Sequence, residues 1–151
     1  MLVYGTANPE GLEDYQGIYL NTSDVDSMVE QVDAAAAAGR RIPVHVEHKG
    51  VAVGEVISAW NRGGRLECVL QLNPRVFEGS ISAEMVRRGM CKDLSLGYSV
   101  ALENTKQGGV KVGSKKLHEI SIVMEGLRPH CHIRGFVQQP PQPQGRGGAA
   151  P

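Results

Sequence analysis

The stretch Lys92-Asp93-Leu94-Ser95-Leu96-Gly97-Tyr98-Ser99-Val100 decides how the rest of the chain is interpreted. Apolar and small polar residues alternate along it, which predicts a half-buried strand. Its two faces are Leu94, Leu96 and Tyr98 on one side and Ser95, Gly97 and Ser99 on the other. The face of Ser95 is therefore low and open enough for another backbone to approach. This makes Ser95 a candidate nucleophile, and a hydroxyl needs an adjacent base to react near neutral pH.

Composition bounds the class of protein. The chain has 151 residues, of which 41% are hydrophobic and 21% charged, and this predicts a soluble globular domain with a sizeable core. Sixteen basic and sixteen acidic residues give a formal net charge of zero, so nothing points to nucleic acid or to an anionic membrane. No apolar run approaches the ~20 residues of a membrane span, and the first residues lack a secretory signal pattern. The three cysteines are odd in number and widely spaced, which favours free thiols in a reducing compartment over disulfides.

Periodicity predicts a β-rich fold. A helix is expected from a cap at Ser23 or Asp24 to Gly39, and one or two short helices are expected within residues 76–89. The expected strands are 2–4, 18–20, 42–48, 51–60, 65–72, 92–100, 117–123 and a last one within 127–133. Turns are expected at 49–50 and 61–64, and a hairpin loop at 103–114. The predicted fold class is mostly β, a compact antiparallel β-barrel with a few peripheral helices.

Two further residues qualify as partners of Ser95. His48 ends an apolar stripe with Val44 and Val46, so it is either a buried core histidine or a general base. Glu119 lies inside the strand 117–123, where a carboxylate needs a partner, and His118 lies on the opposite face of that strand. Three strands therefore offer a nucleophile, a base and an orienting acid.

Three motifs resemble those of viral capsid maturation proteases. Residues 43–48, followed by Val53-Gly54-Glu55-Val56, resemble the histidine motif of the herpesvirus proteases called assemblins. Residues 93–98 resemble both the Leu-Ser-Leu nucleophile motif of assemblins and the Leu-Ser-Ile-Gly-Tyr motif of tailed-phage prohead proteases. Residues 119–128 resemble the assemblin strand whose third triad member stands seven residues before a glycine and a pair of arginines. The two families share a fold, and the motifs span most of residues 42–128.

The resemblance implies roles for individual residues. Ser95 is the implied nucleophile, His48 the general base and Glu119 the third triad member. Assemblins have a second histidine at the third place and prohead proteases a glutamate, so His118 stays open as the alternative, although strand alternation favours Glu119. In assemblins, the backbone N–H of the first arginine and a water held by the second stabilise the oxyanion. Those positions are Leu127 and Arg128 in this chain.

The implied function is that of a serine endopeptidase, which cleaves the internal scaffold protein and its own precursor by acyl transfer without a metal or cofactor. The implied partners are the scaffold substrate, a second copy in a homodimer and, indirectly, the capsid shell proteins, with no nucleic acid and no membrane. The implied location is the procapsid interior, in the host nucleus if the protein is herpesvirus-like and in the bacterial cytoplasm if it is phage-like. The chain is shorter than typical assemblins, so their dimer helices are expected to be missing or rearranged.

The chain divides into a predicted protease domain, 1–137, and a Pro/Gln/Gly-rich tail, 138–151, which is expected to be a disordered linker or a cleaved end. Its small residues 147–150 are a candidate region for self-release. Two other functions stay open. One is a non-catalytic β-barrel interaction module that uses the tail as a ligand. The other is a metal-binding domain with ligands drawn from His45, His48, Cys68, Cys91, His130, Cys131 and His132.

Overall fold

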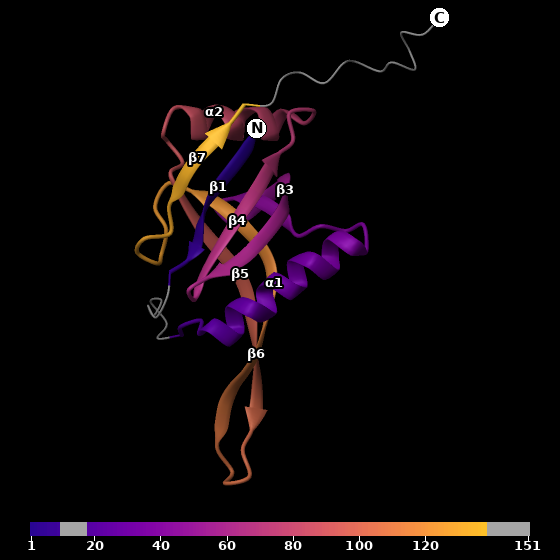
Figure 1. Ribbon diagram of the computed structural model, residues 1–151, viewed down its shortest axis with the longest axis vertical. Coiled ribbons are helices and arrows are strands. Elements are labelled where there is room, and N and C mark those ends of the chain that lie inside the picture. The colour runs from indigo at the N-terminus through magenta and orange to yellow at the C-terminus, as the bar shows by residue number, and fades with distance from the viewer. Residues whose placement is uncertain (10–17, 139–151) are drawn as a thin grey trace, which may run out of the picture.

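One sheet contains all the strands in the part of the chain that the computed structural model describes, residues 1–9 and 18–138 (Figure 1). The elements are β1 (Leu2–Asn8), α1 (Thr22–Ala37), β2 (Pro43–Val46), β3 (Lys49–Arg62), β4 (Arg65–Leu72), α2 (Phe77–Arg87), β5 (Asp93–Asn104), β6 (Val110–Val123) and β7 (Ile133–Val137). The strand order across the sheet is β5-β6-β2-β3-β4-β1-β7. The predicted β-rich character is therefore confirmed, while the predicted tail from residue 139 onward lies outside the described residues.

The predicted antiparallel barrel is wrong in two respects. First, β2 and β6 pair in parallel, whereas the other strand pairs are antiparallel. Second, the sheet does not close among the described residues, where β5 meets the residue before β7 in an isolated bridge between Asp93 and His132. Beside this bridge the Leu94 N–H donates to the Cys131 carbonyl and the Ile133 N–H to the Lys92 carbonyl, each at 2.9 Å. β7 pairs with β1 over residues 133–137 and is short, and no ladder joins it to β5 among the described residues.

Several boundaries differ from those expected. The first hairpin turns at Glu47 and His48, two residues before the predicted turn at 49–50. The last strand begins at Ile133, at the end of the predicted range, and residues 18–20 form no named strand. The turn after β3 falls on Gly63 and Gly64, whose φ angles of 60° and 90° suit a two-residue hairpin turn.

Helix α1 covers one side of the sheet and contacts β3, β4 and β6 (Figure 1). Its cap is Asn21, two residues before the first predicted cap, Ser23, because Asn21 and Asp24 form a reciprocal capping box with bonds of 2.9 and 3.0 Å. Its buried side chains are Val25, Met28 and Val32, at the spacing of an amphipathic helix. Gly39, with a φ of 73°, ends the turn that follows. Helix α2 packs at the other end of the molecule, against β3 and β4.

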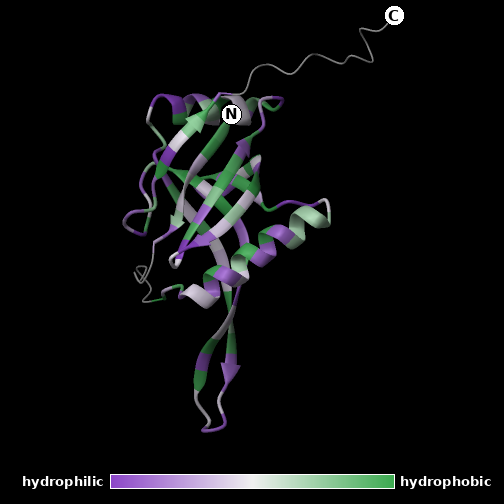
Figure 2. Cartoon of the chain, viewed as in Figure 1, coloured by the Kyte–Doolittle hydropathy of each residue, from purple (hydrophilic) through white to green (hydrophobic). Residues whose placement is uncertain are grey.

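The distal halves of β5 and β6 form an arm that extends beyond the body (Figure 1). The two strands stay paired as far as Asn104 and Val110, so the loop is shorter than the predicted 103–114. Apolar residues lie along the strands of the body, and the arm carries apolar residues as well (Figure 2). On the arm, Leu102, Val110 and Val112 are exposed.

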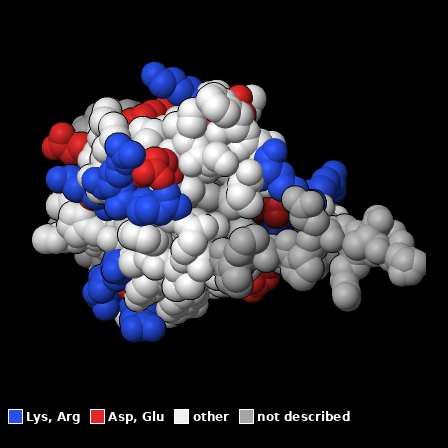
Figure 3. All heavy atoms as spheres, turned by 90° about the horizontal axis from the view of Figure 1, so that it is seen from above, with Lys and Arg blue, Asp and Glu red and all other residues white. Residues whose placement is uncertain are grey.

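The surface carries charges of both signs. On the face seen from above, lysine and arginine side chains lie among aspartates and glutamates (Figure 3). Within residues 1–9 and 18–138, no helix combines the length and hydrophobicity needed to cross a membrane.

The contact of α1 with the sheet predicts the cost of truncating its core side chains. Met28 is fully buried, so Met28→Ala should lower the free energy of unfolding by about 2–5 kcal/mol through lost burial and a cavity. Chemical denaturation monitored by circular dichroism measures this. Glu30→Ala, at an exposed position of the same helix, is the matched control and should change stability by less than about 0.5 kcal/mol. An equal loss in both variants would contradict this packing.

Candidate active site

His48 lies in the tight turn between β2 and β3. Glu47 and His48 have φ angles of 53° and 59°, the left-handed values that a type I′ hairpin turn requires at both central positions. Such turns favour asparagine and glycine, and a left-handed conformation costs other residues about 1–2 kcal/mol each. Other contacts must therefore hold Glu47 and His48 in this conformation.

Three hydrogen bonds donated by backbone N–H groups hold the turn. The Glu47 N–H donates to the Ile122 carbonyl at 3.1 Å, which extends the parallel β2–β6 pairing by one bond. The His48 N–H donates to Ser121 Oγ at 3.0 Å. The carboxylate of Glu47 accepts a bond from the Met124 N–H at 2.7 Å. The turn is thus fixed to β6 and to the residue that follows it.

The ring of His48 joins Ser95 to Glu119. Its Nε2 lies 2.8 Å from Ser95 Oγ, and its Nδ1 is hydrogen-bonded to Oε1 of Glu119. Ser95 is 8% exposed, and the side chains of Glu119 and His48 are 14% and 37% exposed. The three residues predicted from the sequence therefore meet in one place, where the base keeps access to solvent and its two partners are mostly buried.

Strand pairing explains how Ser95 and Glu119 come to share a face. On the β5–β6 ladder Ser95 is opposite Ser121, and Gly97 is opposite Glu119. Residues two apart on one strand point to the same side, so Glu119 and Ser121 both face the site. The alternate residues Ile120 and Ile122 are completely buried in the core. The acid thus stands on a strand whose other face is anchored by packing.

Ser121 is a site residue that the sequence analysis missed. It is 0% exposed, and its hydroxyl donates to Oε2 of Glu119 at 2.6 Å while accepting the His48 N–H. This closes a ring of bonds that orients the carboxylate and the backbone of the base together. The available signal was the spacing Glu119-x-Ser121, which puts a hydroxyl beside the acid on one strand face.

Gly97 has a different role from the one expected. Instead of leaving the face open to a substrate, it leaves room for the acid, since a Cβ on Gly97 would lie 2.0 Å from Oε1 of Glu119. The alternative third residue, His118, lies elsewhere: its Nε2 is 2.7 Å from Ser99 Oγ, and it has no bond to His48. The structure thus brings Glu119, not His118, to the base.

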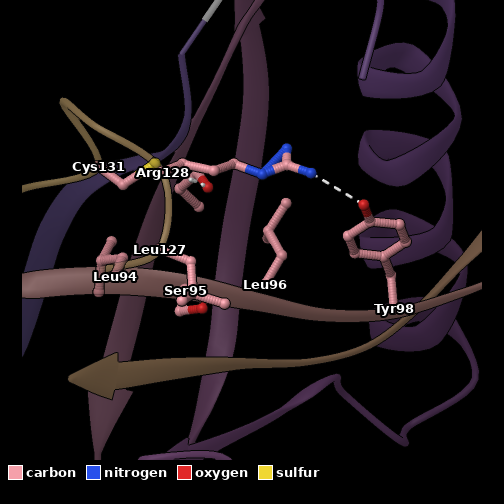
Figure 4. Close-up of a pocket in the computed structure, with 8 residues that line it drawn as sticks. Leu94, Ser95, Leu96, Tyr98, Leu127, Arg128 and Cys131 are labelled. Carbon is pink, nitrogen blue, oxygen red and sulfur yellow. Dashed lines mark hydrogen bonds between the residues drawn. The ribbon is translucent and has the colours of Figure 1, made fainter. Parts of the chain in front are cut away.

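A small pocket adjoins Ser95 (Figure 4). Leu94, Ser95 and Leu96 from β5 line one side, and Leu127, Arg128 and Cys131 line another. The two residues that the sequence analysis assigned to the oxyanion therefore border the same pocket as the candidate nucleophile.

Arg128 is mostly buried and has several partners. Its guanidinium donates to Asn8 Oδ1 at 2.6 Å, to the Tyr98 hydroxyl at 2.8 Å and to the Ile18 carbonyl at 3.3 Å. It also lies over the Tyr98 ring, 5.6 Å from its centroid. These contacts fix the end of the turn that follows β6, and none of the partners could be read from local sequence.

The candidate metal ligands do not come together. Among residues 1–9 and 18–138, no three histidine, cysteine or acidic side chains are placed to share a metal ion. Cys68, Cys91 and Cys131 are free and buried. Burial raises the pKa of all three thiols, that of Cys131 to about 12, which disfavours the thiolate that a metal requires.

Gly97→Ala tests the geometry of the acid. We expect the added methyl to push the Glu119 carboxylate off His48, because the two groups cannot occupy the same space. The low-field proton resonance of a carboxylate-bound Nδ1–H should be present in the wild type and absent in the variant, by proton NMR. Gly135→Ala is the matched control, since nothing lies within 4 Å of its Cβ position. A resonance that survives Gly97→Ala would contradict this arrangement.

Thiol reactivity follows from the raised pKa values. At about pH 8 the three buried thiols stay protonated, so the folded chain should react with Ellman's reagent at a small fraction of the rate of the unfolded chain. Absorbance at the released thionitrobenzoate band measures this. Rapid reaction of one thiol in the folded protein would show that it is exposed or activated.

Comparisons with known proteins assign no family. No family model matches the chain, and no curated protein matches it. Among solved structures, a room-temperature crystal structure of Kaposi's sarcoma-associated herpesvirus protease in complex with an allosteric inhibitor matches with a TM-score of 0.48 and 15% identity. That match covers 87% of this chain and 72% of the other. A likeness this distant cannot assign an activity, so the function has to be inferred from the site itself.

Proposed function

We propose that this chain is a serine endopeptidase in which Ser95 is the nucleophile, His48 the general base and Glu119 the orienting acid. The observation that carries the proposal is the position of the His48 ring, hydrogen-bonded to Ser95 Oγ through Nε2 and to Glu119 through Nδ1. A carboxylate only accepts hydrogen bonds, so it selects the tautomer that carries the proton on Nδ1. Nε2 is then free to accept the proton of Ser95.

The first half of the reaction forms an acyl-enzyme. Ser95 Oγ attacks the carbonyl carbon of a peptide bond while His48 Nε2 takes its proton, and Glu119 stabilises the resulting imidazolium. His48 then gives that proton to the leaving amine as the C–N bond breaks. In the second half, a water attacks the ester, again with His48 as base, and releases the acid and Ser95.

The tetrahedral oxyanion needs donors beside Ser95. We assign the backbone N–H of Leu127 to this role, with a water held by Arg128 as the second donor. Leu127 and Arg128 line the pocket next to Ser95. Among the described residues, the Leu127 N–H donates to no backbone carbonyl. One such donor contributes about 3–4 kcal/mol to transition-state stabilisation.

The proposed substrates are a viral scaffold protein and the precursor of this chain, inside a procapsid. This part of the proposal rests on the resemblance of residues 43–48, 93–98 and 119–128 to the motifs of capsid maturation proteases. A homodimer and indirect contact with shell proteins belong to the same proposal, as does a herpesvirus-infected nucleus or a bacterial cytoplasm as the compartment.

A second candidate function is a non-catalytic interaction module. The observation that favours it is the arm, where Leu102, Val110 and Val112 are exposed on paired strands that extend from the body. Exposed apolar residues on a projecting hairpin are typical of contact surfaces between proteins. In that case Ser95 would be inert.

Labelling with a fluorophosphonate distinguishes the two functions. Intact-mass analysis of the wild type should show one adduct, absent from Ser95→Ala and from His48→Ala. Glu119→Gln should react roughly 10³–10⁴-fold more slowly, because an amide stabilises the wrong tautomer of the base. The matched controls are Ser99→Ala and His118→Ala, which alter the neighbouring serine–histidine pair and should label like the wild type.

The outcomes separate clearly. An adduct that persists in Ser95→Ala, or that disappears in His118→Ala, would refute this assignment of the catalytic residues. No adduct on the wild type over a range of protein concentrations, which includes any that drives dimer formation, would favour the interaction module.

A further inference from the structure

Two acidic side chains hold the segment between β6 and the pocket, and neither belongs to the triad. This segment, Met124 to Leu127, ends beside Ser95. The Met124 N–H donates to Glu47 Oε1 at 2.7 Å, and the Gly126 N–H donates to Asp93 Oδ2 at 2.9 Å. Two backbone N–H groups of the segment are thus each bonded to a carboxylate from a different part of the chain.

The two carboxylates come from the two elements that carry the reacting groups. Glu47 precedes His48 in the β2–β3 turn, and Asp93 lies two residues before Ser95 on β5. If the segment moved, its distances to both His48 and Ser95 would therefore change. The bonds are charge-assisted, and such bonds are shorter and stronger than those between neutral groups.

The segment also lies tightly against β5. A Cβ on Gly126 would be 3.2 Å from the Leu94 carbonyl and 3.4 Å from Asp93 Cβ, so glycine allows this close approach. Asp93 is mostly buried, and its other oxygen lies 2.7 Å from Nδ1 of His132. Arg128, bonded to Asn8 and Tyr98, fixes the chain beyond Leu127.

We propose that Glu47 and Asp93 are positioning residues that hold the segment Met124 to Leu127 against Ser95, so that the Leu127 N–H points at the oxyanion. This inference rests on the proposed function, since it concerns the shape of the same pocket during acyl transfer. The turn that carries His48 and the strand that carries Ser95 then each contribute one carboxylate that positions the oxyanion donor. Such donors must be held within a fraction of an ångström to act.

The test is the rate of fluorophosphonate labelling of Asp93→Ala, Asp93→Asn, Glu47→Ala and Glu47→Gln. Each alanine variant should lower the limiting rate constant by roughly 10- to 100-fold, because the donor is misplaced while the concentration for half-maximal rate is unchanged. The amide variants keep an acceptor and should lose less. In the Asp93 variants the pH midpoint of labelling should stay at the wild-type value, since Asp93 contacts neither His48 nor Glu119.

Two controls separate positioning from loss of structure. His132→Ala removes the other partner of Asp93 but leaves the Gly126 bond, and Glu55→Ala removes an exposed carboxylate of β3, so both should label like the wild type. In the double variant of Glu47 and Asp93, the two losses should be less than multiplicative, because both residues hold one segment. Amide exchange at Met124 and Gly126 should accelerate in the corresponding alanine variants.

Three outcomes of the labelling experiment would contradict this proposal, and each points to a different cause. If the wild type labels at Ser95 and both alanine variants label within about twofold of it, the proposed function stands and the positioning role is refuted. If the variants shift the pH midpoint and leave the limiting rate unchanged, the carboxylates act on His48 instead. If the wild type is not labelled at all, the proposed function fails and this inference fails with it.

Discussion

The parallel pairing of β2 with β6 is the constraint on which the candidate site depends. It places Val44, His45 and Val46 opposite Ile120, Ser121 and Ile122, and thereby brings the end of β2 beside the acid. β6 is also paired with β5 on its other side, so this one strand separates β2, which leads to His48, from the strand of Ser95. Three residues from distant positions in the chain meet because backbone hydrogen bonds fix the spacing between their strands.

The turn that carries His48 shows how side chains compensate for an unfavourable backbone. Glu47 and His48 adopt left-handed backbone conformations, which destabilise a fold when the residue is not glycine. The bonds of Glu47 to Ile122 and Met124 and of His48 to Ser121 offset this destabilisation. Each of those bonds also places a group in the site. Local strain and site geometry are therefore supported by the same contacts.

The sequence was informative where the signal is local. Alternation correctly separated Ser95 and Glu119 from the core residues Leu94, Ile120 and Ile122. It failed at the start of 117–123, where a register shift beside Gly97 leaves Leu117 buried and His118 exposed. It misplaced the first turn, because Gly50 is a turn signal while Glu47 and His48 are not. Ser121 resembles any strand serine until its partners are known, and Arg128 binds Asn8 and Ile18 from the far end of the chain. The unclosed sheet and its parallel pair depend on such distant pairing and on the short length of β7.

The two ends of the sheet meet at Asp93 and His132, next to the candidate nucleophile. The sheet curls without closing, and its paired strands are more rigid than the open edge between β5 and β7. Among the described residues, two backbone bonds join 92–94 to 131–133, far fewer than the bonds that pair β5 with β6, and Arg128 adds a link between Tyr98 of β5 and Asn8 of β1. The bridge between Asp93 and His132 thus lies two residues from Ser95, while the pairing of β6 with β2 and β5 that places His48 and Glu119 does not depend on it.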